Sequence, residues 1–196
     1  MKIELSSVLI WAFDMTLKEF IKPIHDRAEH HPMAQSMVNG TISAAAYADL
    51  LANLLLAYGD VESKARRVGW VEQLDGITRF SAILEDLAEL TSENNLETTI
   101  YHDFIAEYCD RVWRQSKAAT LAHIYVHHMG DMFGGQMLKG KLPGKCRRYE
   151  FDDRKDLIAK IRENLSHDKA EMQEAIAAFD FVIGIYDRVT RKHNIH

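Results

Sequence analysis

The chain has 196 residues, a length typical of one domain and sufficient to bury a hydrophobic core. With 47% hydrophobic and 27% charged residues, 3 prolines and 10 glycines, the composition excludes collagen-like and disordered chains. A net charge of −5 gives no basic face for phosphates, so we expect no nucleic-acid partner. Cys109 and Cys146 match no metal-binding spacing, which favours a reducing compartment over a disulfide framework.

The apolar run from Val8 to Phe13 is short and is followed by Asp14. It is therefore predicted to be neither a signal peptide nor a membrane span. Residues 191–196 are mostly polar and carry no apolar tail. We expect a cytoplasmic protein without a membrane partner.

Helical periodicity dominates the chain. A first helix is expected around residues 17–29, where Pro23 should make it start late or kink. Further helices are predicted over residues 44–61 after an N-cap at Ser43, and over 80–90, 100–112, 117–138 and 172–189. Asp152 or Asp153 could cap another helix that runs through Leu165. Only Arg148–Phe151 has a strand-like pattern. Because the breaks have loop lengths, the sequence predicts an all-α, single-domain bundle over residues 1–196.

Three glycines, Gly130, Gly134 and Gly135, lie within a segment that otherwise has helical spacing. Each interior glycine costs about 1 kcal/mol relative to alanine, so a compensating role is expected. Gly130 and Gly134 share a face, and their bare backbone suits either a flat ligand or close packing of another helix. A buried Asp131 beside that face would need hydrogen-bond partners or ordered water.

His25 and Glu29 are one helical turn apart, so the carboxylate can orient the imidazole as it does for many metal-ligating histidines. Lys18 and Lys22 have the same spacing and can pair with acidic groups of a ligand. Taken alone, the segment is more commonly an exposed helix with ordinary ion pairs.

Together the two segments resemble the heme oxygenase family. The family's distal motif, Tyr-x-x-x-x-Gly-Asp-x-x-Gly-Gly-Gln, is matched by Tyr125, Gly130, Asp131, Gly134, Gly135 and Gln136. Its proximal motif, Leu-Lys-x-x-x-Lys-x-x-His-x-x-Ala-Glu, is matched by Leu17, Lys18, Lys22, His25, Ala28 and Glu29. The order and separation of the motifs agree with the family, and the likeness runs through most of the chain.

The resemblance implies cleavage of heme to biliverdin, by family default the IX-alpha isomer, with release of ferrous iron and carbon monoxide. The reaction uses O2 and electrons from a soluble donor, and heme is both cofactor and substrate. His25 is the implied iron ligand. Gly130 and Gly134 are implied to let the helix lie on the heme, and Asp131 to hold a water on the oxygen-binding side.

The resemblance also implies heme contacts for residues other than His25, Gly130, Gly134 and Asp131. Lys18, Lys22 and Arg162 are expected to pair with the propionates, and the remaining cofactor-binding residues are Glu29, Tyr125, Gly135 and Phe179, with Tyr58 as a further pocket tyrosine.

Four positions depart from the family's pattern. His127 stands where many members have an arginine of the distal water network, and Val182 replaces an asparagine of that network. Phe133 replaces a small residue, and Ile158 a lysine near Arg162. We therefore expect a network rebuilt around Asp131.

A basic stretch without acidic residues contains Lys139, Lys141, Lys145, Arg147 and Arg148. It suits docking of an acidic electron donor, for which ferredoxin is the expectation from the resemblance. A solvated lysine-rich loop is an equally good interpretation.

Three other kinds of function remain open. A heme carrier would bind through His25 without degrading heme. A non-heme enzyme on the same scaffold would be either a di-iron oxygenase, which needs a second set of inward Glu and His residues, or a thiamin-degrading hydrolase, which needs a pocket cysteine. A purely structural bundle leaves the glycines unexplained.

Overall fold

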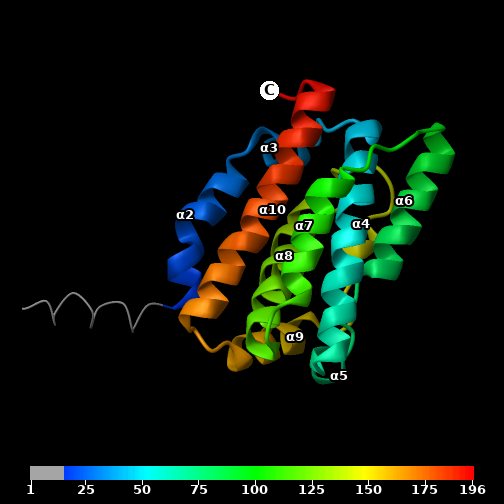
Figure 1. The fold of residues 1–196 in the computed structure, drawn as a ribbon. Helices are drawn as coiled ribbons and strands as arrows, with labels where there is room; N and C mark the ends of the chain where they lie inside the picture. The colour runs from blue at the N-terminus through cyan, green and yellow to red at the C-terminus, as the bar shows by residue number, and fades with distance from the viewer. Residues whose placement is uncertain (1–15) are drawn as a thin grey trace, which may run out of the picture.

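The computed structural model describes residues 16–196, so the apolar run 8–13 lies outside the described residues (Figure 1). Within them the regular structure is helical: α2 (Leu17–Glu29), α3 (Pro32–Asn39), α4 (Ala44–Arg67), α5 (Trp70–Gln73), α6 (Phe80–Asn94), α7 (His102–Trp113), α8 (Lys117–Leu138), the 3-10 helix η2 (Arg147–Tyr149), α9 (Arg154–Asn164) and α10 (Lys169–His193). The all-α prediction is confirmed. Among the described helices, none combines the length and apolar character of a membrane span.

α10 is the central helix of the half of the bundle that contains both motifs. It packs most extensively against α8 and also against α2, α3 and α4. α4 in turn packs against α6, α7 and α8. Figure 1 shows α2 and α6 at opposite edges of the bundle. α2 and α8 have little direct contact, so α10 fixes their relative position.

Helix α2 begins at Leu17, earlier than Pro23 led us to expect. Thr16 accepts a hydrogen bond from the backbone of Glu19, whose carboxylate accepts one from the backbone of Thr16. This capping box stabilises the first turn. Pro23 lies inside a helix that continues to Glu29, so the cap and the burial of Leu17 and neighbouring apolar residues outweigh the hydrogen bond that proline removes.

Arg148–Phe151, the only strand candidate in the sequence, does not form a strand. Residues Arg147–Tyr149 form the 3-10 helix η2 instead. The backbone N–H of Arg148 donates to the buried Asp86 carboxylate of α6 at 3.0 Å, and its side chain turns into the core. These interactions, which lie far apart in the sequence, leave no extended edge for strand pairing.

Candidate active site

The glycine face of α8 is open. Apart from the chain neighbours and the adjacent backbone of α8 itself, a Cβ atom placed on Gly130 or on Gly134 would have no atom within 4 Å. The neighbouring side chains are also unusually exposed for large apolar residues, Phe133 by 50% and Met137 by 64%. Close packing of another described helix therefore does not explain these two glycines, and their bare backbone is available to a flat ligand.

Gly135 faces a different environment. It is buried, and a Cβ atom there would lie 2.2 Å from Cδ1 of Tyr149. Its missing side chain makes room for the Tyr149 ring. The structure therefore gives Gly135 a packing role, and the heme contact that the resemblance implies for it stays a prediction.

Asp131 is 3% exposed and both of its carboxylate oxygens have protein partners. The Tyr58 hydroxyl donates to Oδ2 at 2.7 Å, and Nη2 of Arg148 donates to Oδ1 at 2.6 Å. Burial, followed by the Asp131 charge, raises the pKa of Tyr58 well above its ordinary value, so the phenol keeps its proton. Asp131 is thus held in one orientation, one residue along from the open Gly130.

Arg148 was predicted to lie on a docking surface, and that assignment is wrong. The residue is 5% exposed, and its guanidinium lies 5.5 Å from the Tyr58 ring and 4.9 Å from the Tyr149 ring. Burial alone would lower the pKa of Arg148, but the Asp131 charge and the nearby tyrosines Tyr149, Tyr58 and Tyr47 together outweigh burial and raise the pKa well above its ordinary value. A run of basic residues gives no signal that one of them turns inward, so sequence reasoning missed this site residue.

A second group of buried polar side chains adjoins Tyr58. The Tyr108 hydroxyl lies 2.9 Å from Nδ1 of His123 and 2.7 Å from Nε2 of His127. The His127 ring packs 5.2 Å from the Tyr58 ring, centroid to centroid. The sequence flagged His127 as a departure from the family's pattern but gave no indication of Tyr108 or His123.

On α2, the side chain of His25 is 47% exposed, and its Nδ1 lies 3.6 Å from Oε2 of Glu29. A proton on Nδ1 is attracted by that carboxylate, which leaves Nε2 free as a ligand atom. The edge of the imidazole meets the Phe179 ring of α10, with centroids 5.7 Å apart. The predicted pair His25 and Glu29 is therefore brought together, and Phe179 supports it.

The predicted cationic residues flank these two helices. Lys22 is exposed and pairs with Asp26 at 2.6 Å, and Lys18 is exposed on the same helix. Arg162 of α9 is also exposed, and its guanidinium lies 5.6 Å from the ring centroid of Phe133 on the open part of α8. Burial raises the pKa of Tyr125, and Arg162 acts in the opposite direction.

The side chains at this site fit heme better than a di-iron centre or a nucleophilic cysteine. An imidazole with a free nitrogen suits iron, the bare face of α8 suits a planar ring, and the exposed cations suit propionates. Within residues 16–196, the His25, Asp26 and Glu29 cluster is the only group with metal-binding spacing, so no second di-iron ligand set is found there. Burial raises the pKa of Cys109 to about 12 and also raises that of Cys146, which disfavours a nucleophilic thiol.

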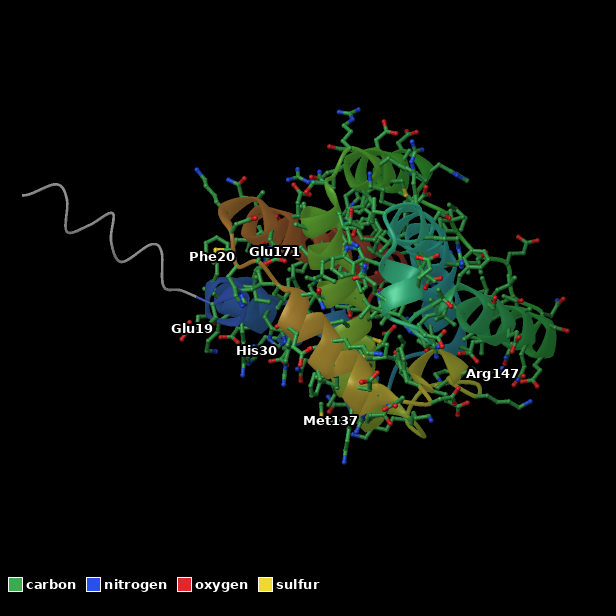
Figure 2. All side chains as sticks on the ribbon, turned by 90° about the horizontal axis from the view of Figure 1, so that it is seen from below. Glu19, Phe20, His30, Met137, Arg147 and Glu171 are labelled. Carbon is green, nitrogen blue, oxygen red and sulfur yellow. The ribbon has the colours of Figure 1, made fainter. Side chains whose placement is uncertain are left out.

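Much of the basic stretch is neutralised by neighbouring carboxylates. Lys139 lies 3.1 Å from Glu150, and Lys145 lies 3.0 Å from Glu89. Arg147 pairs with both Glu89 and Asp86 of α6. Figure 2 places Arg147 on the opposite side of the molecule from α2, where Glu19 and His30 are labelled.

Comparisons with known proteins agree with this geometry. The family model described as heme oxygenase matches residues 12–185. The heme oxygenase of Rhodella violacea is 24% identical over 169 residues, covering 72% of this chain and 67% of that protein. Heme oxygenase 2 of Mus musculus is also 24% identical, and the aligned part covers 88% of this chain but only 64% of the mouse protein.

Solved structures show the same fold. The crystal structure of heme oxygenase-1 from the cyanobacterium Synechocystis in complex with heme superimposes with a TM-score of 0.76 and 22% identity, covering 90% of this chain and 91% of that chain. Heme oxygenase from Leptospira interrogans gives a TM-score of 0.71 and 22% identity, covering 89% and 100% of the two chains. Because the family model spans most of the sequence, the chain belongs to the heme oxygenase family.

Proposed function

We propose that this protein binds heme through His25 and cleaves it to biliverdin IX-alpha, ferrous iron and carbon monoxide. The observation that carries the proposal is the open face of α8 at Gly130 and Gly134, next to the buried Asp131. Two free, buried cysteines agree with a protein kept in the reducing cytoplasm.

When bound, heme supplies both the iron that binds O2 and the porphyrin that is oxidised. Nε2 of His25 is the proposed iron ligand. Glu29 holds the proton of the same ring on Nδ1 and thereby makes the imidazole a better donor. Phe179 limits rotation of the ring through its edge contact.

Gly130 and Gly134 let the backbone of α8 lie close to the porphyrin, because any side chain there would occupy the space of the ligand. Tyr58 and Arg148 hold the Asp131 carboxylate, and each occupies only one lone pair of its oxygen. The remaining lone pairs are free to accept a hydrogen bond from a water molecule. That water would donate a hydrogen bond to the reacting oxygen.

Lys18, Lys22 and Arg162 are the proposed partners of the propionates. Their positions on α2 and α9 would fix how the heme is rotated, and therefore which meso carbon is attacked. Lys22 would have to leave Asp26, a modest cost because surface ion pairs contribute about 0.2–1 kcal/mol.

We also propose that a soluble ferredoxin supplies electrons, with Lys139, Lys141 and Lys145 as the exposed contacts. Lys141 donates to the carbonyl of Val38, so its charge is not neutralised by that partner. If long-range attraction guides docking, the second-order rate of turnover with a plant-type ferredoxin should fall as salt rises. A rate that does not change between low and high salt would contradict docking at these lysines.

The decisive experiment adds hemin to the purified protein under anaerobic conditions and then supplies O2, ferredoxin and its reductase. We expect an imidazole-type spectrum that His25→Ala abolishes, followed by loss of the Soret band and appearance of one bilin isomer by chromatography. A Soret band that survives O2 and reductant would identify a heme carrier instead. A spectrum unchanged in His25→Ala would exclude His25 as the ligand.

A further inference from the structure

Four buried side chains form a continuous series from α10 to α8, which we call the Tyr108 chain: Glu174, His123, Tyr108 and His127. Nε2 of His123 lies 3.2 Å from Oε2 of Glu174, and Nδ1 of the same ring lies 2.9 Å from the Tyr108 hydroxyl. That hydroxyl lies 2.7 Å from Nε2 of His127. His123 is 0% exposed and His127 5% exposed, so solvent cannot reorganise the protons between them.

The charge at one end of the Tyr108 chain is fixed. Arg111 donates to both oxygens of Glu174, at 2.7 and 2.9 Å. Burial alone would raise the pKa of Glu174, but the interactions with His123 and Arg111 together outweigh burial and lower the pKa, so the group is a carboxylate at neutral pH. An ionised carboxylate can only accept hydrogen bonds, so the Glu174 carboxylate favours a proton on Nε2 of His123. Nε2 of His123 and Oε2 of Glu174 are close but not aligned for a hydrogen bond, so Glu174 acts on His123 mainly through its charge.

The number of available protons then determines the direction of the hydrogen bonds at Tyr108 and His127. With its proton on Nε2, neutral His123 has a bare Nδ1 that accepts from the Tyr108 hydroxyl. Tyr108 has no second proton, so its oxygen must accept from Nε2–H of His127. Burial, followed by the nearby His128 and His123, lowers the pKa of His127 well below its ordinary value. A neutral His127 with its proton on Nε2 has a bare Nδ1.

We propose that Glu174 is a positioning residue that acts through His123 and Tyr108 to hold His127 as the Nε2-protonated tautomer, with Nδ1 as a hydrogen-bond acceptor. His127 and Asp131 are one turn apart on α8, and both adjoin Tyr58. Within residues 16–196 no group hydrogen-bonds to Nδ1 of His127. We expect a water molecule to donate a hydrogen bond to this nitrogen.

This inference deepens the proposed function, because the water accepted by His127 would lie beside the one held by Asp131. An arginine at position 127 would offer only hydrogen-bond donors to this water. Nδ1 of His127 is an acceptor, so here the water would donate the hydrogen bond instead of accepting it. The donor-only guanidinium is present instead at Arg148, where it orients Asp131.

The test is a two-bond 1H–15N correlation spectrum of the histidine rings in the heme-free protein at pH 8. The His127 signals are identified by their loss in His127→Gln. In the native protein we expect Nδ1 of His127 at the strongly downfield position of an unprotonated nitrogen. Because no heme is present, the result does not depend on whether the protein degrades heme.

Two variants and one control test the coupling. Glu174→Gln removes the charge that orients the chain, and Tyr108→Phe removes the hydroxyl that connects the histidines. In both, the Nδ1 resonance of His127 should move upfield as the other tautomer becomes populated, whereas Glu163→Gln on the exposed face of α9 should leave it unchanged. An Nδ1-protonated His127 in the native protein would overturn the proposal, and so would a His127 that keeps its proton on Nε2 in both variants.

Discussion

The glycines at positions 130 and 135 belong to the same helix but have opposite surroundings. Gly130→Ala should raise the free energy of unfolding of the heme-free protein by up to about 1 kcal/mol, since alanine is the better helix former and its Cβ meets nothing within 4 Å. Gly135→Ala should lower that free energy by about 1–3 kcal/mol, because its Cβ overlaps the Tyr149 ring. Urea denaturation of both variants measures the two effects.

Hemin titration of the same pair separates stability from ligand binding. Gly130→Ala should weaken hemin binding although the protein is more stable, because the added methyl group projects into the proposed ligand space. Equal hemin affinity in Gly130→Ala and the native protein would argue against that placement of the heme.

Arg148 and Asp131 form a buried ion pair whose two members depend on each other. Arg148→Met should lower the free energy of unfolding by about 3–5 kcal/mol, because the Asp131 charge is left buried with Tyr58 alone. The double variant Arg148→Met/Asp131→Leu should be more stable than Arg148→Met, since no unpaired charge remains. The exposed Lys155→Met provides the control, with an expected change within about 0.5 kcal/mol.

At the scale of single helices, α2 remains helical although Pro23 lies in its interior. Pro23→Ala restores a backbone N–H inside the helix and should raise the free energy of unfolding by about 2 kcal/mol. Pro32→Ala is the matched control, because Pro32 lies in the first turn of α3, where proline is favoured. There we expect a small loss. Thermal unfolding of the two variants distinguishes a strained proline from a general effect of removing proline.

The helices that the sequence predicted best are those with long apolar stripes. The bounds predicted for residues 117–138 are those of α8, and Ser43 and Asp153 cap α4 and α9. The short helices α3 and α5 were missed, because eight and four residues are too few to establish a helical period.

The site was predictable where a motif is local and was not where distant segments converge. His25 with Glu29, and the glycines with Asp131, lie within one helix each, so their spacing already places them together. Arg148 and Tyr108 approach Asp131 and His127 only through the packing of separate elements. Nothing in the local sequence around Arg148 distinguishes it from Arg147, whose side chain pairs near the surface.

For the whole molecule, the buried histidines predict a pH dependence of stability. Burial lowers the pKa of His127 and of His123 below 6.5, the ordinary value that both regain on unfolding. Below about pH 6.5 the unfolded chain therefore binds more protons, so the free energy of unfolding should fall as pH decreases, until the folded-state pKa values are reached. Glu174, whose pKa is also lowered, adds to the loss below pH 4.5.

Urea denaturation at pH 7.5, 6.5 and 5.5 measures this dependence. Two neutral buried histidines give a slope of up to about 2.7 kcal/mol per pH unit below pH 6.5. In His127→Gln the slope should be about half as steep. A stability that is flat from pH 7.5 to 5.5 would contradict the lowered pKa values, because it would mean that the folded and unfolded chains bind equal numbers of protons.

The central position of α10 has a consequence for motion. α2 and α8 contact each other little, and both are anchored on α10. Without a ligand, α2 is therefore held in the bundle mainly by α10, with a smaller contact to α3. A heme that bridges the two helices would connect α2 directly to α8. When hemin binds, amide hydrogen exchange should therefore slow far more in α2 than in α4 or α6.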